Sequence, residues 1–413
     1  MKLLVVCASL DLTQPFSATP SWWQLLKGLY EIGVEVVATP YQGPAIESLW
    51  WRAEPNPAQW QGDLFKALRD AYRKLAGEQP PVQGEYTNVG TRHDVSAPPH
   101  NADTHDDESL SDKWIRRAAQ TLIAPLWARH LDRILSKQAD IDAVLVLTVP
   151  LNHLVGVAEE IQRNHRKPVL YYDGDVPASL PNMRGFASGF RIYQGANPAE
   201  YTAFISNSKG GEEALKQLGA RAVHTLFYAA DPDVFSPVNV PRQDIDVFFY
   251  GHGREYRARW IDDMITHPSN AMPEARFAVR GTKLGHLGGA QLLPYLSFSK
   301  LREYACSSKI NLCITRRAHA SVYGSSSARP FELAAMGCCI VANPYAGIEL
   351  WFEPGKELFV VQSQEEAIDR YRYLLAHDAE RMAVGRAARE RALKEHTFRR
   401  RAQQLVDIIQ QYL

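Results

Sequence analysis

The amino-acid sequence predicts an α/β protein made of two consecutive domains, each built on a parallel sheet. Short apolar runs alternate with helix-forming segments along the 413 residues, which is the pattern of βαβ units whose sheet is buried on both faces. The proline-rich stretch 230–241 interrupts this alternation, which then restarts. The length also exceeds that of one typical domain. We therefore expect a first domain over residues 1–236 and a second domain that begins at residue 237.

The first half opens with a clear βαβ unit. Residues 3–7 form an apolar run, Thr19 and Pro20 are typical of a helix start, and Gly33 is typical of a helix end. Further apolar runs follow, separated by polar and helix-forming segments. The predicted strands of this half are residues 3–7, 34–38, 143–148, 169–172, 203–206 and 223–227.

The second half repeats the pattern with helices between five apolar runs. Its predicted strands are residues 246–250, 276–280, 310–314, 339–342 and 358–361. From about residue 367 the chain turns strongly helical, and Thr397 is suited to cap a final helix. Four aliphatic residues give that helix an apolar face: Leu405, Ile408, Ile409 and Leu413.

Residues 77–112 lack apolar periodicity and contain few large aliphatic side chains. Long segments of this kind are either functional loops or unstructured insertions. The sequence leaves both interpretations open, a lid over a site or a surface insertion.

Composition limits the class of protein. Lys+Arg 46 balance Asp+Glu 46, so an overall electrostatic grip on nucleic acid is not expected. Five cysteines, without metal-ligand spacing, argue against a disulfide framework and against a zinc site. No apolar run approaches the roughly 18 residues of a membrane-spanning helix. We expect a cytoplasmic protein, with peripheral membrane association left open.

Ligands of open parallel sheets bind beyond the carboxyl ends of the strands. Three segments of the second half follow predicted strands and carry guanidinium or ammonium groups suited to phosphate. These basic side chains are Arg254, Arg257, Arg280, Lys283 and Arg316. They are the first candidates for residues that bind the phosphate groups of a ligand.

The segment that follows Arg316 is the most informative one. Small residues lead through Pro330 into a helix, so backbone N–H groups and the helix dipole favour an anionic ligand. Glu332, in the first turn, is suited to accept ribose hydroxyls, although an ordinary favourable charge at a helix start is the alternative. The candidate binding residues here are Tyr323, Gly324, Ser325, Ser326, Ser327, Arg329 and Glu332.

This segment resembles a known family. Residues 325–341 read SSSARPFELAAMGCCIV and, with residues 347–349 and 352–357, resemble the donor-binding half of group 1 glycosyltransferases, the family-4-like group. The likeness is greatest to the spore-maturation-protein-like branch. The stretch 228–237 is similar to the interdomain segment of that group.

The resemblance implies a GT-B architecture, in which two Rossmann-like domains face an interdomain cleft. Residues 1–236 would then form the acceptor-side domain and residues 237–396 the nucleotide-sugar domain, with a helix over 397–413 crossing back onto the first domain. It implies a UDP- or GDP-sugar as substrate, no cofactor and no metal. The acceptor, a glycan, a protein or a small molecule, stays open.

Carried over residue by residue, the resemblance assigns Glu332 to the nucleotide ribose. It assigns Arg329 and the serines 325–327 to the loop near the diphosphate and sugar. One position departs from the family: many retaining members carry a second glutamate where this chain has Gly324. The usual contact to the donor hexose is therefore in question, and retention or inversion stays open.

Two places in the first half are catalytic candidates. Asp173 and Asp175 follow a predicted strand and spell the Asp-x-Asp that GT-A transferases use to hold a divalent metal. The two-domain pattern favours the metal-independent alternative, in which either carboxylate faces the cleft as acceptor binder or base. His153, near a predicted helix start, is the third candidate, and an ordinary histidine of a helical first turn is its alternative.

The expected function is transfer of a sugar from a nucleotide-diphosphate-sugar to an acceptor hydroxyl. Basic side chains and helix N-terminal amides would stabilise the leaving diphosphate. Two alternatives remain: a nucleotide-sugar epimerase or hydrolase on the same fold, and a non-catalytic sugar-nucleotide-binding protein.

Overall fold

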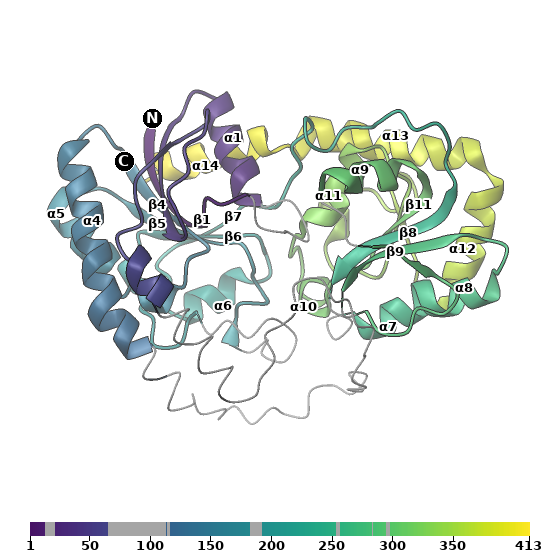
Figure 1. Cartoon of the computed structure of the whole chain (residues 1–413), viewed down its shortest axis with the longest axis horizontal. Helices are drawn as coiled ribbons and strands as arrows, with labels where there is room; N and C mark the ends of the chain where they lie inside the picture. The colour runs from purple at the N-terminus through teal and green to yellow at the C-terminus, as the bar shows by residue number, and fades with distance from the viewer. Residues whose placement is uncertain are drawn as a thin grey trace.

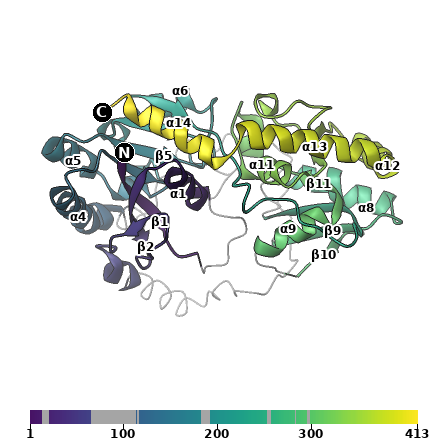
Figure 2. The same cartoon turned by 90° about the horizontal axis from the view of Figure 1, so that it is seen from above.

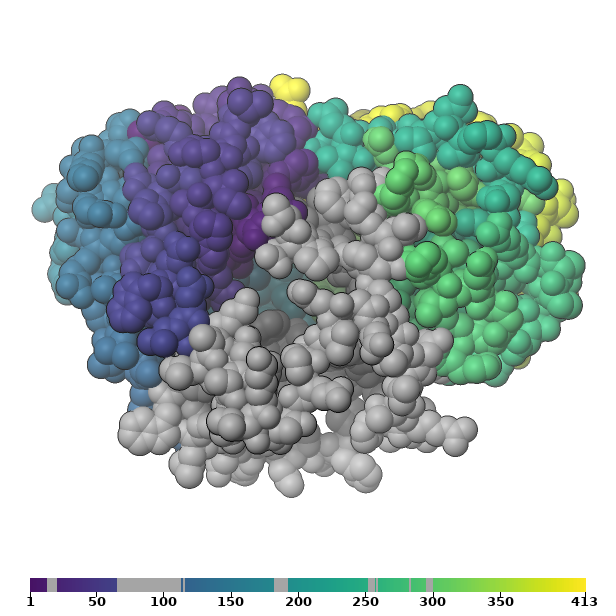
Figure 3. All heavy atoms as spheres, in the orientation of Figure 1, coloured from purple at the N-terminus to yellow at the C-terminus, as the bar shows by residue number. Residues whose placement is uncertain are grey.

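The computed structural model describes residues 1–12, 21–64, 113, 116–181, 192–252, 257–282, 284–294 and 298–413. The expected loop over residues 77–112 lies outside the described residues. Two α/β domains stand side by side, each around its own sheet (Figure 1). The space-filling view shows the same division, with purple to blue surface on one side and green to teal surface on the other (Figure 3).

The first domain contains a seven-stranded sheet of order β3-β2-β1-β4-β5-β6-β7, and all neighbours pair in parallel. The order reverses between β1 and β4, which is where parallel sheets open a crevice for ligands. The six predicted strands are present, and the two-residue edge strand β3 was missed. The strands are β1 Lys2–Ser9, β2 Glu35–Gln42, β3 Arg52–Ala53, β4 Ala143–Leu147, β5 Val169–Asp173, β6 Ala203–Ser206 and β7 Val223–Thr225.

Helices bury both faces of this sheet because successive strand residues point to opposite faces. Val6 of β1 belongs to the core cluster that contains Trp127, on the face covered by α4 and α5. Its neighbour Val5 belongs to the opposite cluster, which contains Leu25 of α1 and Leu405 of α14. These helices are α1 Ser21–Glu31, α4 Ala124–Lys137, α5 Val157–His165 and α14 Phe398–Gln410, with the shorter α6 Glu212–Gln217 near the domain boundary.

The second domain contains a six-stranded parallel sheet of order β10-β9-β8-β11-β12-β13. The five predicted strands are present, and the two-residue edge strand β10 was missed. The strands are β8 Ile245–His252, β9 Phe277–Thr282, β10 Gln291–Leu292, β11 Ser308–Cys313, β12 Ile340–Ala342 and β13 Phe359–Val360. The helices include α7 Ala258–Ile261, α8 His267–Ala271, α9 Phe298–Cys306, α10 Arg317–Ser321, α11 Ala328–Ala335, α12 Gln364–Ala376 and α13 Asp378–Glu395.

The chain crosses back to the first domain at its end. Figure 2 shows α13 on the second domain and α14 on the first as consecutive yellow helices. The Thr397 side chain accepts a hydrogen bond from the backbone N–H of Arg400, which is the predicted cap. Leu405, Ile408 and Ile409 are buried as expected, but Leu413 is 62% exposed because α14 ends at Gln410.

The two crossings of the chain between the domains are tied together. The N–H of Ala230 donates to the His396 carbonyl at 3.1 Å, and the N–H of Phe398 donates to the Ala230 carbonyl at 3.2 Å. The buried Arg401 guanidinium donates to the carbonyls of Phe227 and Tyr228. The last strand of the first sheet ends at residue 225 and the first strand of the second begins at residue 245, so the expected boundary at 236/237 lies in this connection.

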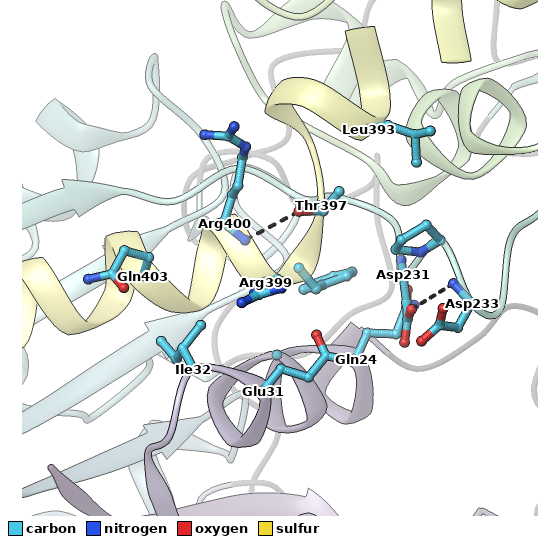
Figure 4. A pocket seen from close by; sticks show the side chains of 13 residues that line it. Gln24, Glu31, Ile32, Asp231, Asp233, Leu393, Thr397, Arg399, Arg400 and Gln403 are labelled. Atoms are coloured by element: carbon cyan, nitrogen blue, oxygen red, sulfur yellow. Dashed lines mark hydrogen bonds between the residues drawn. The ribbon is translucent and has the colours of Figure 1, made fainter. Parts of the chain in front are cut away.

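A pocket of about 650 Å³ lies beside the crossing, between α1, residues 231–233 and the start of α14 (Figure 4). Lys27 of α1 pairs there with Asp231 at 2.9 Å and with Asp233 at 2.7 Å. None of the sequence-predicted site residues lines this pocket. These ion pairs connect α1 to the segment that links the two domains.

Candidate active site

The loops that follow β5 and β11 meet between the domains. Nη2 of Arg316, the residue before α10, lies 2.6 Å from Oδ1 of Asp175 in the other domain. Ala178 and Ala318 form a small apolar contact beside this ion pair. The carboxyl ends of the two sheets are thus brought together, and the ion pair joins one candidate residue from each domain.

Glu332 lies buried in α11, with 1% of its surface exposed. Strand alternation places Tyr250 of β8 in the core cluster of α11, whereas Phe249 belongs to the cluster on the opposite face. The Tyr250 hydroxyl donates a hydrogen bond to Oε2 of Glu332 at 2.9 Å. The other carboxylate oxygen, Oε1, has no hydrogen-bond partner among the described residues. The site therefore holds a buried carboxylate with one oxygen fixed and one oxygen left to accept.

Burial and two neighbouring groups act in opposite directions on the pKa of Glu332. Burial raises the pKa of the Glu332 carboxyl, while Arg329 and the hydrogen bond from Tyr250 oppose the rise. The Arg329 guanidinium lies over the Tyr250 ring, 3.4 Å from the ring centroid, as a cation–π contact. Arg329 is thus held beside Glu332 by a ring and not by a carboxylate.

Ser325 and Ser326 form hydrogen bonds with the first domain. The N–H and the hydroxyl of Ser326 both donate to the Asn207 carbonyl at 2.9 Å. The hydroxyl oxygens of Ser325 and Ser208 lie 2.6 Å apart, and both side chains are fully buried. The N–H of Gly210 donates to the Tyr323 carbonyl at 2.8 Å. Residues 323–326 and 207–210, which we call the interdomain seam, therefore join the two domains.

Ser325 and Ser326 were expected near the diphosphate and sugar. In the structure their hydroxyl groups contact the loop 207–208 of the first domain, far away in the sequence. Ser327 is half-buried and precedes α11, with the Tyr345 hydroxyl 3.4 Å from its Oγ. Tyr323 keeps a side chain that is 44% exposed, so of this stretch Ser327 and Tyr323 remain accessible.

Gly324 has a structural reason to be glycine. Its φ is +59°, a left-handed conformation that side chains rarely adopt. A Cβ there would lie 2.9 Å from Cδ1 of Leu350 and 3.2 Å from Cβ of Lys209. The positive φ, more than the contact with the flexible end of Leu350, disfavours the glutamate that the family resemblance would place at this position.

The basic candidates divide into three groups. Nε of Arg257 donates to the Ile314 carbonyl at 2.8 Å, which places it with Arg316 near the end of β11. Arg280 lies within β9, buried, where its Cα pairs with that of Tyr250. Arg254 and Lys283 lie outside the described residues.

The sequence predicted that Asp173 or Asp175 faces the cleft, but the carboxylate of Asp173 is buried inside the first domain. Only 1% of the residue is exposed. Its Oδ2 accepts from the hydroxyls of Ser179 and Tyr193, both at 2.6 Å, and Oδ1 accepts from the N–H of Asp175 at 2.9 Å. Burial raises the pKa of Asp173. The residue orders the turn that presents Asp175, and both of its oxygens are occupied.

His153 lies on the first domain, in a short 3-10 helix after β4, Leu151–His153. Its Nδ1 is 2.7 Å from the Tyr41 hydroxyl, and Tyr41 stacks on Trp127. Burial lowers the pKa of His153, so the neutral imidazole is favoured. Thr148, which directly follows β4, is exposed and has a φ of +53°.

Sequence reasoning missed His319, which lies three residues after Arg316 in α10. The residue is 1% exposed, and its Nε2 lies 3.9 Å from Oδ1 of Asp175. Burial, Arg316 and Arg257 all lower the pKa of His319. The only signal in the sequence was its position three residues after Arg316, in the helix that Arg316 precedes.

Metal ligands and membrane spans were searched over the described ranges. Within them, no group of three or more His, Cys, Asp or Glu side chains is placed to hold a metal ion. No helix of the described chain is long and apolar enough to cross a membrane.

Residues 256–407 match the family model described as "Glycosyl transferase-like". No curated protein matches the chain. Similar solved structures include sucrose-phosphate synthase from Thermosynechococcus elongatus, with 12% identity, coverage of 100% of this chain and 99% of that one, and a TM-score of 0.65. Trehalose-6-phosphate synthase OtsA has 12% identity, coverage of 100% and 99%, and a TM-score of 0.63. HepE from Anabaena in complex with UDP-glucose has 12% identity, coverage of 100% of both chains, and a TM-score of 0.58.

These comparisons confirm the predicted fold class. The chain has two Rossmann-like domains arranged as in GT-B glycosyltransferase structures, and its second half carries a glycosyl transferase-like domain.

Proposed function

We propose that this protein is a GT-B glycosyltransferase that moves a sugar from a nucleoside-diphosphate-sugar to an acceptor hydroxyl. The observation that carries the proposal is the buried Glu332 carboxylate inside the glycosyl transferase-like domain, one oxygen of which finds no hydrogen-bond partner in the described ranges. The HepE structures contain UDP-glucose or UDP, and the same class of donor is proposed here.

Glu332 is proposed to bind the ribose of the donor. A buried carboxylate oxygen without a partner is costly, and a hydroxyl that donates to it removes this cost. Tyr250 fixes the other oxygen at 2.9 Å, so Oε1 has a defined position before the nucleotide arrives. A preordered acceptor loses little freedom when the ligand binds.

Arg316, Arg257 and Arg329 are proposed to face the diphosphate. Arg316 and Arg257 lie at the end of β11, and Arg329 stands beside Glu332 in the first turn of α11. Guanidinium groups bind phosphate oxygens with charge-assisted hydrogen bonds, and they stabilise the charge that develops on the leaving diphosphate. This role would make a divalent metal unnecessary.

The acceptor is proposed to bind against the first domain. Asp175 and His153 remain the candidates for the base that takes the proton of the acceptor hydroxyl. Asp175 is the carboxylate next to Arg316, whereas the His153 imidazole is oriented by Tyr41. Asp173 supports Asp175 from within the domain. Membership of the spore-maturation-protein-like branch and a cytoplasmic location are further parts of this proposal.

A nucleotide screen by thermal shift tests the proposal without knowledge of the acceptor. A ligand at about 100 times its Kd stabilises the folded state by about 2.7 kcal/mol, which is easily seen as a rise in Tm. UDP- or GDP-sugars should raise the Tm, and adding acceptors should then release the nucleoside diphosphate.

Other outcomes decide between the alternatives. Consumption of the donor without any acceptor favours a hydrolase or epimerase. Binding without turnover over a broad acceptor panel favours a sugar-nucleotide-binding protein. A Tm that no nucleotide or nucleotide-sugar raises contradicts the proposal.

A further inference from the structure

A buried histidine without a full set of partners lies at the meeting point of the domains. His319 belongs to α10, one helical turn after Arg316, and only 1% of its surface is exposed. Within the described part of the chain its Nδ1 has no hydrogen-bond partner, and its Nε2 lies 3.9 Å from Oδ1 of Asp175, which is beyond hydrogen-bond distance. A buried polar atom of this kind costs stability, so its presence requires an explanation.

The surroundings of His319 define what it is suited to bind. Burial together with Arg316 and Arg257 lowers the pKa of the imidazole, so the ring stays neutral. A neutral imidazole carries one N–H and one lone pair, and it therefore suits a hydroxyl group better than an anion. The neighbouring guanidinium groups are the natural partners of phosphate. A ligand that carries a hydroxyl-rich group next to a phosphate matches both features at once.

We propose that Nδ1 of His319 forms a hydrogen bond with the sugar of the bound donor, and that this contact gives the site its preference for a nucleotide-sugar over the free nucleoside diphosphate. The inference rests on the proposed function and names a sugar-recognising residue for it. Nε2 faces Asp175 across the domain boundary, so the two ring nitrogens have different roles.

Two substitutions separate the two nitrogens. His319→Asn places a polar atom near the position of Nδ1 and removes Nε2, whereas His319→Gln places one near Nε2 and removes Nδ1. Calorimetric titrations of the full chain with UDP-glucose, UDP, GDP-glucose and GDP give the ratio of sugar-nucleotide to nucleotide affinity for whichever pair the wild type binds. His130→Asn is the matched control, because His130 is also buried but contacts Thr39 in the core of the first domain.

We expect His319→Gln to reduce the preference for the nucleotide-sugar by about fivefold to thirtyfold, the usual worth of one hydrogen bond to a ligand. His319→Asn should keep the preference within about threefold of the wild type, as should His130→Asn. Affinity for the free nucleoside diphosphate should change little in all three variants.

A preference that survives His319→Gln overturns the inference and leaves the proposed function intact. A loss in His319→Asn but not in His319→Gln also overturns it, because the contact with Asp175 would then be the one that matters. If His319→Asn fails to fold, His319→Gln decides alone by the same ratio. If His319→Gln fails to fold, His319→Leu, which also lacks Nδ1, takes its place. A wild type that binds neither pair overturns the inference together with the proposed function.

Discussion

The hydroxyl of Tyr250 donates a hydrogen bond of 2.9 Å to Oε2 of Glu332, and no described residue donates one to Oε1 of the same carboxylate. The two residues come from β8 and α11, which pack together in the core of the second domain. Folding therefore places a buried carboxylate near the carboxyl end of the sheet, with a hydrogen bond to one of its two oxygens. Such a group lowers the stability of the empty protein, and it is suited to a ligand that supplies the missing donor.

Tyr250→Phe removes the hydrogen bond that fixes Glu332. We expect a loss of stability of about 1 to 3 kcal/mol, because a second carboxylate oxygen loses its partner. Nucleotide affinity should also fall, since the ribose acceptor is no longer held in place. Tyr371→Phe is the matched control: the Tyr371 hydroxyl donates to the Met264 carbonyl at 3.0 Å and is equally buried. Urea unfolding and nucleotide titration of both variants check this, and equal affinities would contradict it.

Ser326→Ala distinguishes the interdomain seam from a phosphate-binding loop. The Ser326 hydroxyl donates to the Asn207 carbonyl and accepts from the N–H of Tyr228 at 2.8 Å. Its removal should cost about 1 to 3 kcal/mol of stability and leave the affinity for UDP or GDP unchanged. Ser308→Ala, which loses a hydrogen bond within the second domain, serves as the control. A tenfold loss of diphosphate affinity in Ser326→Ala alone would restore the sequence-based interpretation.

Substitutions of the two ion-pair partners Asp175 and Arg316 should change the affinity for a nucleoside diphosphate in opposite directions. Arg316→Met should weaken binding of UDP or GDP by about tenfold, because one charge-assisted contact to the diphosphate is lost. Asp175→Asn should strengthen it, since the carboxylate competes with the diphosphate for the guanidinium. The nucleoside without phosphates should bind all three proteins equally. Titrations with the diphosphate and with the nucleoside test this, and a parallel loss in both variants would contradict it.

Chelation should leave nucleotide binding and turnover intact. The expectation follows from the Asp-x-Asp segment itself, because Asp173 accepts three hydrogen bonds within its domain and Asp175 is paired with Arg316. Both carboxylates are therefore engaged by other groups of the protein. Activity measured before and after EDTA treatment decides the matter. Loss of activity with EDTA and recovery with Mn²⁺ would show that these aspartates act as metal ligands.

The larger features of the fold followed from local patterns in the sequence. Apolar runs such as residues 3–7 and 247–250 became central strands because a strand buried on both faces is mostly apolar. Strands β3 and β10 were missed because two residues at a sheet edge carry no periodicity. Leu413 was assigned to the buried face of the last helix, but the helix ends before it.

The site was harder to predict, since its contacts join distant parts of the chain. Ser326 and Asn207 are 119 positions apart, and nothing near Ser326 in the sequence indicates that Asn207 will use its hydroxyl. Asp173 is the last residue of β5, at the end of the sheet where ligand-binding residues are expected, but its carboxylate accepts hydrogen bonds from Ser179 and Tyr193. The Glu332 assignment was made from its place in a helical first turn and from the family resemblance. The structure adds the contact with Tyr250, which no local pattern contains.

Titration of Glu332→Gln with a nucleoside diphosphate, beside a melting curve of the empty protein, tests the central claim most directly. Burial raises the pKa of Glu332, so the ionised carboxylate lowers stability at neutral pH, and that loss disappears as the pH falls below the ordinary carboxyl range. The neutral amide should therefore raise the Tm of the empty protein at pH 7 by about 2 °C or more, with a smaller gain near pH 4. Nucleotide affinity should fall by about fivefold to a hundredfold, because a charged acceptor of ribose hydroxyls is lost. Unchanged affinity together with a lowered Tm would contradict the assignment of Glu332 to the donor.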